Sequence, residues 1–297
     1  MLILNEEQVR ELLCLEDLIP VVAQALIDLS AGRVQQPVRS VLQVSKHNGL
    51  WALMPAVYDD IMGAKLVTLY EENSGRGIPT HQASIQLFSA RTGEALALMD
   101  GRLITELRTA AVSAVATRLL AKPDARVLAI LGSGVQAKSH VQALRMVRQF
   151  DEVRVWSRTP EHAQRFAQAI GGRATSREDA VRGADVVVTV STTREPLVLG
   201  EWLNLDAYVN AVGTVGLNQR ELDDAVMNAA VVVESAESAL RESGDIVHSG
   251  ASIYAELGEL LASKKAIPGG RIVFKSLGIA ATDIAAATMV YRQAKNQ

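Results

Sequence analysis

The stretch from Arg126 to Ala137, Arg-Val-Leu-Ala-Ile-Leu-Gly-Ser-Gly-Val-Gln-Ala, constrains the fold of this 297-residue chain more than any other. An apolar run typical of a buried strand leads into Gly132 and Gly134, spaced Gly-x-Gly-x-x-Ala, and then into a helical segment. In such a turn the glycines permit a tight bend and a close approach of phosphates to the backbone, and the third, small position lets helix pack on strand. The helix N-terminus adds free N–H groups and a positive dipole end. The pattern alone also fits a structural turn, so its context decides.

The context is an alternation of apolar strands and helices after Val127. The candidate strands are continuous Val, Ile, Leu and Ala runs, as expected for parallel strands that are covered on both faces. They are Val127–Leu131, Val153–Trp156, Val186–Val190, Tyr208–Val212, Val231–Val233 and Ile272–Phe274. This rhythm predicts an α/β fold, a Rossmann-type doubly wound parallel sheet, with Gly132 and Gly134 in the strand-to-helix turn where that fold binds a dinucleotide.

The preceding residues have a different rhythm. Helices are predicted over Glu6–Leu13, capped by Asn5, and over Leu15–Ser30, with Cys14 packed in the core. Short strands broken by turn residues follow, at Arg39–Val44, Leu50–Met54, Ala64–Tyr70, Ala83–Phe88 and Ala95–Met99. We therefore expect an α+β domain over residues 1–112, joined by a helix at Thr105–Leu120 to a Rossmann domain over residues 113–281.

Composition excludes several functional classes. The net charge of −3 gives no electrostatic reason to bind nucleic acid or anionic membrane, and 4% aromatic residues offer no stacking platform for bases. No apolar run approaches the ~18 residues of a membrane helix. A single cysteine fits a reducing compartment, and the first residues lack the pattern of a signal peptide. We expect a cytoplasmic protein without a metal.

The residues after the second Rossmann strand indicate which dinucleotide binds. An NAD site usually has an acidic residue there for the ribose 2′-OH. This chain has Ser157, Arg158 and Thr159 instead. A guanidinium and two hydroxyls suit a 2′-phosphate, which predicts NADPH, with NADH weaker. The alternative is that Arg158 is an ordinary solvated residue.

Three cations stand out in the first domain. Arg39 begins a strand, Lys65 interrupts an apolar strand, and Arg108 is expected in the first turn of the linking helix, where it would oppose the helix dipole by about 0.3–1 kcal/mol unless an anion lies beside it. Each has an ordinary alternative, since Lys65 can extend to water and the arginines can pair with surface carboxylates. Together they predict a pocket for a substrate carboxylate, in which Lys65 could protonate a nitrogen.

Several motifs, in order and nearly from end to end, resemble the ornithine cyclodeaminase/mu-crystallin family. They are Gln36-Pro-Val-Arg39, Lys65-Leu-Val-Thr-Leu-Tyr-Glu71, Ile78-Pro-Thr-His81-Gln-Ala-Ser84, Met99-Asp-Gly101, Arg108-Thr-Ala-Ala-Val-Ser-Ala114, Leu131-Gly-Ser-Gly-Val-Gln-Ala137, Asn210-Ala-Val-Gly213, Arg220-Glu-Leu-Asp-Asp224, Glu242-Ser-Gly-Asp245 and Phe274-Lys-Ser-Leu-Gly278. The likeness is greater to the mu-crystallin branch, NADPH-dependent ketimine reductases, than to the cyclodeaminases.

The resemblance implies a homodimer built through the N-terminal domains, with the C-terminal helix, residues 282–297, folding back onto that domain. It also implies roles for individual residues. Substrate-binding positions are matched by Arg39, Lys65, Arg108 and Glu242, with Lys65 and Arg108 also catalytic. Cofactor-binding positions are matched by Thr80, His81, Gln82, Arg108, Gly132, Gly134, Val135, Gln136, Ser157, Arg158, Thr159, Thr189, Val212 and Ser276. For His81, a hydrogen bond to the backbone is the alternative.

Two departures separate this chain from the cyclodeaminases. Those enzymes carry an aspartate in the loop after the fourth Rossmann strand, where this chain has Val215, and a glutamate at the position of Ala52. A valine cannot exchange protons. The missing acids argue against ornithine and for a substrate without a second free amine, with Val215 lining its site.

The sequence thus predicts NADPH-dependent reduction of the C=N bond of cyclic or linear α-imino acids, such as Δ1-piperideine-2-carboxylate and Δ1-pyrroline-2-carboxylate, to L-amino acids. One alternative is an amino-acid dehydrogenase or reductive aminase acting on a keto acid plus an amine. Another, also implied by the resemblance, is a protein that binds NADPH or an iodothyronine-like ligand without turnover.

Overall fold

The structure, a computed structural model, describes residues 1–73 and 75–296. It divides into two compact units. Unit 1 comprises residues 1–108 and 278–297, and unit 2 residues 109–277, so the divisions fall before the predicted ones at 112/113 and 281/282. The last helix, α11, spans Ala280–Lys295, and Gln297, the predicted end of this helix, lies outside the described residues.

Unit 1 contains a mostly antiparallel sheet in the order β1-β7-β6-β5-β4-β2, with β3 also paired to β4. Its strands are β1 (Leu2–Leu4), β2 (Val34–Gln35), β3 (Ser40–Val44), β4 (Gly49–Tyr58), β5 (Ile61–Tyr70), β6 (His81–Ser89) and β7 (Ala95–Asp100). The meander of β4 to β7 confirms the predicted α+β fold. The short β1, parallel to β7, and β2 have too few residues for an alternating pattern to reveal them.

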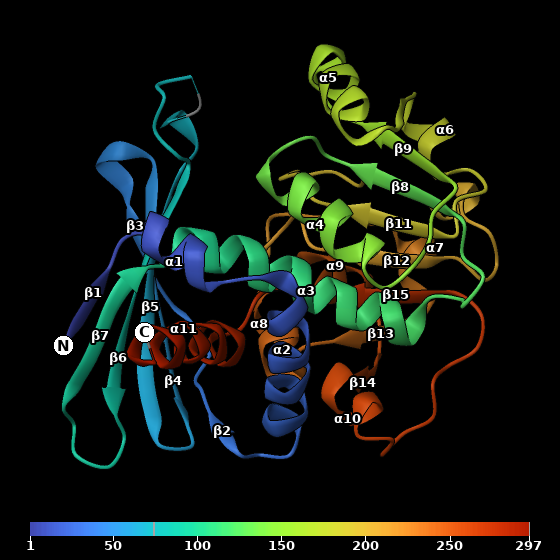
Figure 1. The fold of residues 1–297 in the computed structure, drawn as a ribbon. Helices are drawn as coiled ribbons and strands as arrows, with labels where there is room; N and C mark the ends of the chain where they lie inside the picture. The colour runs from blue at the N-terminus through green and yellow to red at the C-terminus, as the bar shows by residue number, and fades with distance from the viewer. Residues whose placement is uncertain (74, 297) are drawn as a thin grey trace. The chain divides into compact units, whose positions relative to one another are not determined.

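Helices cover one face of this sheet (Figure 1). They are α1 (Glu6–Leu12), α2 (Leu15–Ser30) and α11, and α11 packs against α2, β4, β5 and β6. On β4 the side chains of Ala52 and Met54 are buried, while those of Trp51 and Leu53 are exposed, because successive residues of a strand face opposite sides. The part of the exposed face that β4 forms therefore carries apolar side chains.

Two local predictions in unit 1 are wrong. Helix α3 spans Arg102–Leu120 rather than starting at Thr105, because the Asp100 carboxylate accepts a 2.9 Å hydrogen bond from the Arg102 N–H and caps the helix. Arg108 is consequently beyond the first turn, and the expected conflict with the helix dipole does not arise. Cys14 is exposed, because it lies at the N-cap of α2 instead of on the buried face.

Unit 2 confirms the predicted Rossmann-type fold. Its sheet is entirely parallel, in the order β10-β9-β8-β11-β12-β15-β13-β14. The strands are β8 (Val127–Leu131), β9 (Glu152–Trp156), β10 (Arg173–Ala174), β11 (Val186–Thr189), β12 (Tyr208–Ala211), β13 (Ala230–Val233), β14 (Ile253–Glu256) and β15 (Ile272–Lys275). The helices are α4 (Val135–Arg145), α5 (Pro160–Ile170), α6 (Arg177–Val181), α7 (Asp224–Met227), α8 (Ala236–Glu242), α9 (Gly244–Ser249) and α10 (Leu257–Leu261). The strand order reverses between β8 and β11, the switch point at which such sheets bind ligands.

Candidate active site

Lys65 lies in the interior of unit 1. Its side chain points from β5 toward α11 and is 2% exposed. The Nζ atom is 2.6 Å from Oδ2 of Asp283, in the first turn of α11. The sequence-based alternative that Lys65 reaches water is therefore wrong, because a buried carboxylate holds the ammonium in the interior.

Arg108 shares the same carboxylate. Its Nε donates a 2.8 Å hydrogen bond to Oδ1 of Asp283, and its side chain is 5% exposed. The guanidinium lies against Gly278, where an added Cβ would come within 2.8 Å of both terminal nitrogens. Gly278 also has φ of +72°, so this position requires glycine on two counts. Among the described residues, no side-chain or backbone acceptor meets the buried Nη1 of Arg108.

Arg39 joins this group through the backbone. Its Nη2 donates a 2.6 Å hydrogen bond to the carbonyl oxygen of Gly278. Nearby, the side-chain oxygen of Gln36 accepts a 2.8 Å hydrogen bond from the N–H of Ala281 at the start of α11. The segment carrying Gln36 and Arg39 thus fixes the chain where α11 begins. The three cations predicted from the sequence lie in one unit. Lys65 and Arg108 share the Asp283 carboxylate, and Arg39 is close enough to influence the charge of Lys65.

The electrostatics of this cation cluster, defined as Arg39, Lys65, Arg108 and Asp283, favour an anion. Burial lowers the pKa of Lys65 to about 8, with Asp283 opposing that change and the two guanidinium groups adding to it. Burial alone would raise the pKa of Asp283, but Arg108 and Lys65 hold it below its usual value. Lys65 and Arg108 share one ionised carboxylate, so these two cations leave an excess of positive charge over Asp283, which a bound anion would offset.

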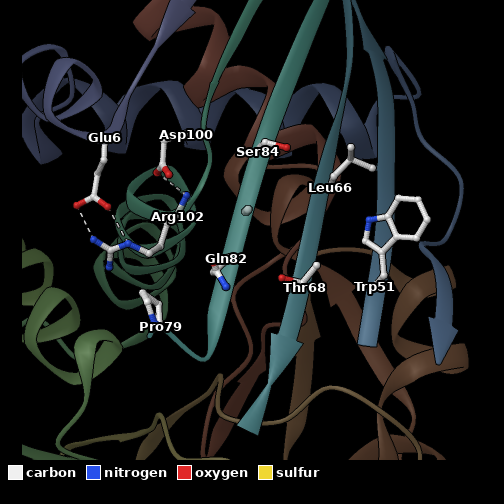
Figure 2. A pocket seen from close by; sticks show the side chains of 10 residues that line it. Glu6, Trp51, Leu66, Thr68, Pro79, Gln82, Ser84, Asp100 and Arg102 are labelled. Atoms are coloured by element: carbon white, nitrogen blue, oxygen red, sulfur yellow. Dashed lines mark hydrogen bonds and ion pairs between the residues drawn. The ribbon is translucent and has the colours of Figure 1, made fainter. Parts of the chain in front are cut away.

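The predicted segment from Thr80 to Gln82 is divided between two faces of the sheet in unit 1. His81 is on the face of Lys65, since the β5–β6 register pairs Lys65 with Ile85 and alternate residues share a face. Its Nδ1 is 3.5 Å from Oγ1 of Thr80. Gln82 instead lines a cavity of about 440 Å³ on the opposite face, with Trp51 and Thr68 (Figure 2). The structure therefore does not bring Gln82 to the cation cluster.

In unit 2, the glycine turn follows β8 as predicted. Gly132 has φ of +149°, and an added Cβ would be 2.9 Å from Val190 and 3.0 Å from its carbonyl oxygen. Its N–H donates a 2.8 Å hydrogen bond to the carbonyl of Trp156 at the end of β9. Gly134 is the N-cap of α4, and the space that its Cβ would occupy is open. The turn thus leaves room at the N-terminus of an 11-residue helix, as a dinucleotide phosphate requires.

The residues around this turn fit a dinucleotide. Ser133 donates a 3.0 Å hydrogen bond to Ser157, which follows β9. Arg158 is exposed, and within residues 1–73 and 75–296 nothing forms an ion pair with it. Val135 is 53% exposed at the start of α4, and the side-chain oxygen of Gln136 is buried without a hydrogen-bond donor in the described part of the chain.

Other predicted cofactor residues lie at the carboxyl ends of neighbouring strands. Thr189 ends β11 and pairs with Ala211 of β12, directly before Val212. Ser276 follows β15, but its hydroxyl is buried and donates a 3.1 Å hydrogen bond to Glu234. The three positions gather at one edge of the sheet, with Ser276 directed into the interior.

The predicted substrate residues Val215 and Glu242 are close together in unit 2. The N–H of Gly216 donates a 2.8 Å hydrogen bond to the carbonyl oxygen of Glu242, at the end of α8. Val215 is 38% exposed in this loop after β12. The substrate residues proposed from sequence are thus distributed over both units.

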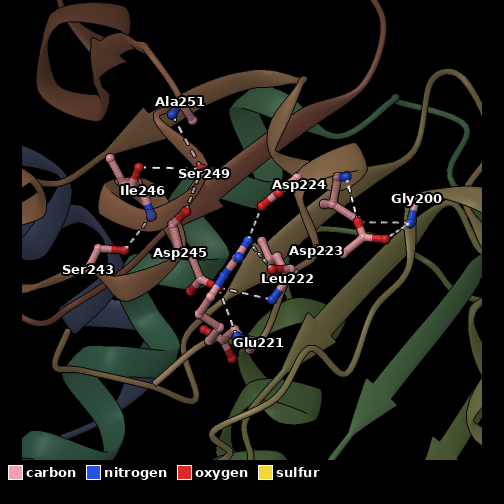
Figure 3. Close-up of polar contacts among 12 residues, drawn as sticks. Gly200, Glu221, Leu222, Asp223, Asp224, Ser243, Asp245, Ile246, Ser249 and Ala251 are labelled. Carbon is pink, nitrogen blue, oxygen red and sulfur yellow. Dashed lines mark hydrogen bonds and ion pairs between the residues drawn. The ribbon is translucent and has the colours of Figure 1, made fainter. Parts of the chain in front are cut away.

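A buried ionic network supports this loop, and the sequence analysis did not anticipate it. Lys275, at the end of β15, has its Nζ 2.5 Å from Glu221 and 2.9 Å from Asp245, and it donates 3.1 Å hydrogen bonds to the carbonyl and hydroxyl of Thr214. Asp245 also accepts the N–H groups of Glu221 and Leu222, at 2.8 and 3.0 Å (Figure 3). Lys275, Glu221 and Asp245, hereafter the Lys275 network, hold the loop from within the core.

Known proteins share this architecture. The model of the ornithine cyclodeaminase/mu-crystallin family matches residues 1–297. The chain belongs to this family. It is 48% identical over 284 residues to the ketimine reductase mu-crystallin of Mus musculus, covering 92% of this chain and 91% of that protein. It is 36% identical over 318 residues to a Δ1-pyrroline-2-carboxylate reductase of Bacillus cereus, covering 99% of this chain and 97% of that protein.

Solved structures of other proteins agree with the fold of this family member. The Δ1-pyrroline-2-carboxylate reductase of Thermococcus litoralis, in complex with NADH and L-proline, has a TM-score of 0.94 and 35% identity, covering 100% of this chain and 98% of that chain. An archaeal alanine dehydrogenase dimer with bound NAD has a TM-score of 0.94 and 30% identity, covering 100% of this chain and 96% of that chain.

Two other kinds of site are absent among the described residues. In the part of the chain that the structure describes, no three or more His, Cys, Asp or Glu side chains group as a metal ion would require. None of the helices described has both the length and the apolar character for crossing a membrane.

Proposed function

We propose that this protein reduces the C=N bond of α-imino acids with NADPH, giving L-amino acids. The observation that carries the proposal is the cation cluster, where a buried Nη1 of Arg108 lacks an acceptor among the described residues and positive charge exceeds negative. A substrate carboxylate supplies both the acceptor and the charge. The ketimine reductase and Δ1-pyrroline-2-carboxylate reductase relatives support the same chemistry.

The residues of unit 1 have distinct tasks in this reaction. Arg39 and Arg108 bind and orient the carboxylate, and positioning of this kind contributes several kcal/mol to catalysis. Bound NADPH supplies the hydride to the imine carbon. Lys65 holds a proton on Nζ and gives it to the imine nitrogen, so that one hydride and one proton convert C=N to CH–NH. With a pKa of about 8, the ammonium is present near neutral pH and yields its proton readily.

Unit 2 is proposed to hold the cofactor. The turn at Gly132 and Gly134 and the N-terminus of α4 would bind the pyrophosphate. Ser157, Arg158 and Thr159 would bind the 2′-phosphate, since a carboxylate that would accept from a ribose 2′-OH is missing from this segment. Thr189 and Val212 would line the nicotinamide end.

Arg158→Ala tests the cofactor preference. Losing a charge-assisted phosphate contact, worth about 1.5–3 kcal/mol, is expected to raise KM for NADPH roughly 10- to 100-fold while KM for NADH changes little. Steady-state kinetics with both cofactors measure this. Arg165→Ala, at an exposed position on α5, is the matched control. Equal effects on both cofactors would contradict a 2′-phosphate contact.

The proposed activity is tested by incubating the protein with NADPH and either Δ1-piperideine-2-carboxylate or Δ1-pyrroline-2-carboxylate. We expect cofactor oxidation and formation of pipecolate or proline. Absence of turnover with both imines would contradict the proposal, and tight binding of NADPH without turnover would favour a ligand-binding role.

A second candidate is reductive amination of a keto acid with ammonia or an alkylamine. It is favoured by 32% identity over 312 residues to an alanine dehydrogenase of Archaeoglobus fulgidus, covering 99% of this chain and 95% of that protein. The same cation cluster would bind the keto acid. Faster turnover of pyruvate plus methylamine than of the cyclic imines would select this candidate.

We also propose that the exposed face of the unit 1 sheet forms a homodimer. Leu42, Trp51 and Leu53 are 60%, 44% and 39% exposed on neighbouring strands, and the archaeal alanine dehydrogenase relative is a dimer. Trp51→Glu is expected to weaken dimerisation by about 2 kcal/mol or more, roughly 30-fold in Kd, measured by analytical ultracentrifugation. Leu205→Glu, at an 87% exposed position in unit 2, should leave the dimer intact. A monomeric wild-type protein would contradict this proposal.

A further inference from the structure

We propose that Asp283 is a positioning residue for this reaction, which keeps Lys65 charged and directs the terminal nitrogens of Arg108 toward the substrate carboxylate. This inference rests on the proposed function. Its geometric basis is a single carboxylate, 0% exposed, whose two oxygens bridge two cations, at 2.6 Å from Nζ of Lys65 and 2.8 Å from Nε of Arg108.

Hydrogen bonds hold the backbone around Asp283. It lies in the first turn of the 16-residue α11, whose N-terminal end is held by the side-chain oxygen of Gln36 at 2.8 Å from the N–H of Ala281. The Thr282 hydroxyl adds a 2.9 Å hydrogen bond to the carbonyl of Ile279. A carboxylate on a helix that is held in this way is positioned more precisely than one on a loop.

The carboxylate determines which donors of Arg108 remain for a ligand. Because Nε donates to Asp283, the guanidinium fork is oriented with Nη1 and Nη2 beside Gly278. Nη1 is buried and has no acceptor within the residues described. A buried donor without an acceptor is unfavourable, so the orientation that Asp283 imposes is one that a substrate carboxylate would complete.

The same carboxylate controls the charge of Lys65. The charged and titratable groups that face Lys65 are Arg39 from the segment before β3, Arg108 from α3, His81 from β6 and Asp283 from α11. The guanidinium groups and burial all lower the pKa of Lys65, and only Asp283 raises it. Without this carboxylate, the pKa of Lys65 would fall further, so that less of the lysine would carry a proton to donate at neutral pH.

Asp283→Asn tests the inference, because it keeps the shape and removes the charge. We expect kcat/KM for imine reduction at about pH 7 to fall roughly tenfold, and the pH at which activity declines on the alkaline side to move down by about two units. The Kd for NADPH, measured by fluorescence, should stay unchanged. Asp283→Glu, which retains the charge, should recover the wild-type pH midpoint even where kcat is reduced. Asp124→Asn, at an exposed position, is the control for loss of one acid.

The outcomes separate positioning from a purely structural role. A uniform loss of activity in Asp283→Asn with an unchanged pH midpoint would overturn the inference, and so would a shifted midpoint in Asp283→Glu. If Asp283→Asn does not fold, the Asp283→Glu profile decides alone. If the wild type reduces neither imine, the proposed function fails, and calorimetric binding of pyruvate across pH tests Asp283 separately. Binding of pyruvate should be lost as the pH rises, and the midpoint of this loss should lie at a lower pH in Asp283→Asn than in the wild type. Identical midpoints would refute the inference.

Discussion

Replacing Lys65 by methionine is expected to lower kcat/KM for imine reduction by about 10²–10⁴-fold, the usual contribution of a positioned proton donor. Methionine has similar length, suits a buried position on β5 and removes the proton together with one cation of the cluster. Asp283 remains paired with Arg108 at 2.8 Å, so the fold of unit 1 should persist. The dinucleotide cradle lies in unit 2, and Kd for NADPH should therefore be unchanged.

The charge of Lys65 determines how kcat/KM depends on pH. Lys65, with a pKa of about 8, is an ammonium below that pH and loses its proton above it. In the wild type kcat/KM should thus be constant below about pH 8 and fall roughly tenfold per pH unit above it. Bound substrate adds a negative charge beside Lys65, which raises its pKa, so the decline of kcat should occur at higher pH. The Lys65→Met variant should show neither decline.

Two controls complete this experiment. Lys65→Arg keeps the cation but holds its proton too tightly to transfer it, so KM should be affected less than kcat. Glu71→Gln removes an acid near the end of β5 that lies outside the cation cluster, and it should leave kcat within about twofold. A Lys65→Met variant that retained more than a tenth of wild-type kcat/KM would exclude Lys65 as the proton donor.

The sequence predicted the Rossmann unit well because its signals are local. Continuous apolar runs mark buried parallel strands, and two glycines mark the turn after β8. The strands that escaped prediction are β10, which has two residues, and β14, whose Ile253–Glu256 mixes polar and apolar residues. Neither is long enough to establish a period.

The cation cluster was predicted only in part, because its counter-charge is distant in sequence. Lys65 was conspicuous as a charge within an apolar strand. Asp283 was not, since it lies in an alanine-rich helix that reads as packing, and it is 175 residues beyond Arg108. A sequence shows that a buried lysine needs a partner, but only the tertiary fold identifies it.

At the sheet edge of unit 2, the motifs locate the residues but do not reveal where each side chain points. The cofactor-pocket role of Ser276, which the resemblance implies, stays a prediction, and in the structure its hydroxyl donates to Glu234 in the interior. Lys275, the residue before it, was quoted only as part of a motif and proves to be the centre of a buried ionic network. Neighbouring positions of a strand end differ in direction, and a motif does not say which side chain faces the ligand.

That network leads to the prediction with the largest effect on stability. Lys275→Met is expected to lower the free energy of unfolding by about 3–5 kcal/mol, the usual cost of removing one partner from a buried ion pair. Burial alone would lower the pKa of Lys275, but Glu221 and Asp245 raise it, so the wild-type lysine is charged. Its loss leaves two buried carboxylates facing each other. Urea denaturation followed by circular dichroism measures the change.

The pH dependence of this loss follows from Glu221. Burial and Asp245 raise its pKa, and Lys275 is the group that opposes them most. Once Lys275 is removed, the folded state favours the protonated form of Glu221. At any pH above the unfolded-state pKa of Glu221, folding then requires the uptake of a proton, and this uptake becomes less favourable as the pH rises. The destabilisation should therefore be smaller at about pH 5 than at about pH 8, and Lys275→Met with Glu221→Gln should recover part of it.

A surface lysine provides the comparison for Lys275. Lys264→Met, at an exposed position after α10, should change the free energy of unfolding by no more than about 0.5 kcal/mol at either pH. A loss below about 1 kcal/mol in Lys275→Met would mean that the two carboxylates relax or reach water.

The Lys275 network also holds Thr214, one residue before Val215. The Lys275→Met variant should therefore bind the imine less tightly than the wild type, even under conditions where it is fully folded. Stability and substrate binding would then depend on the same buried charges.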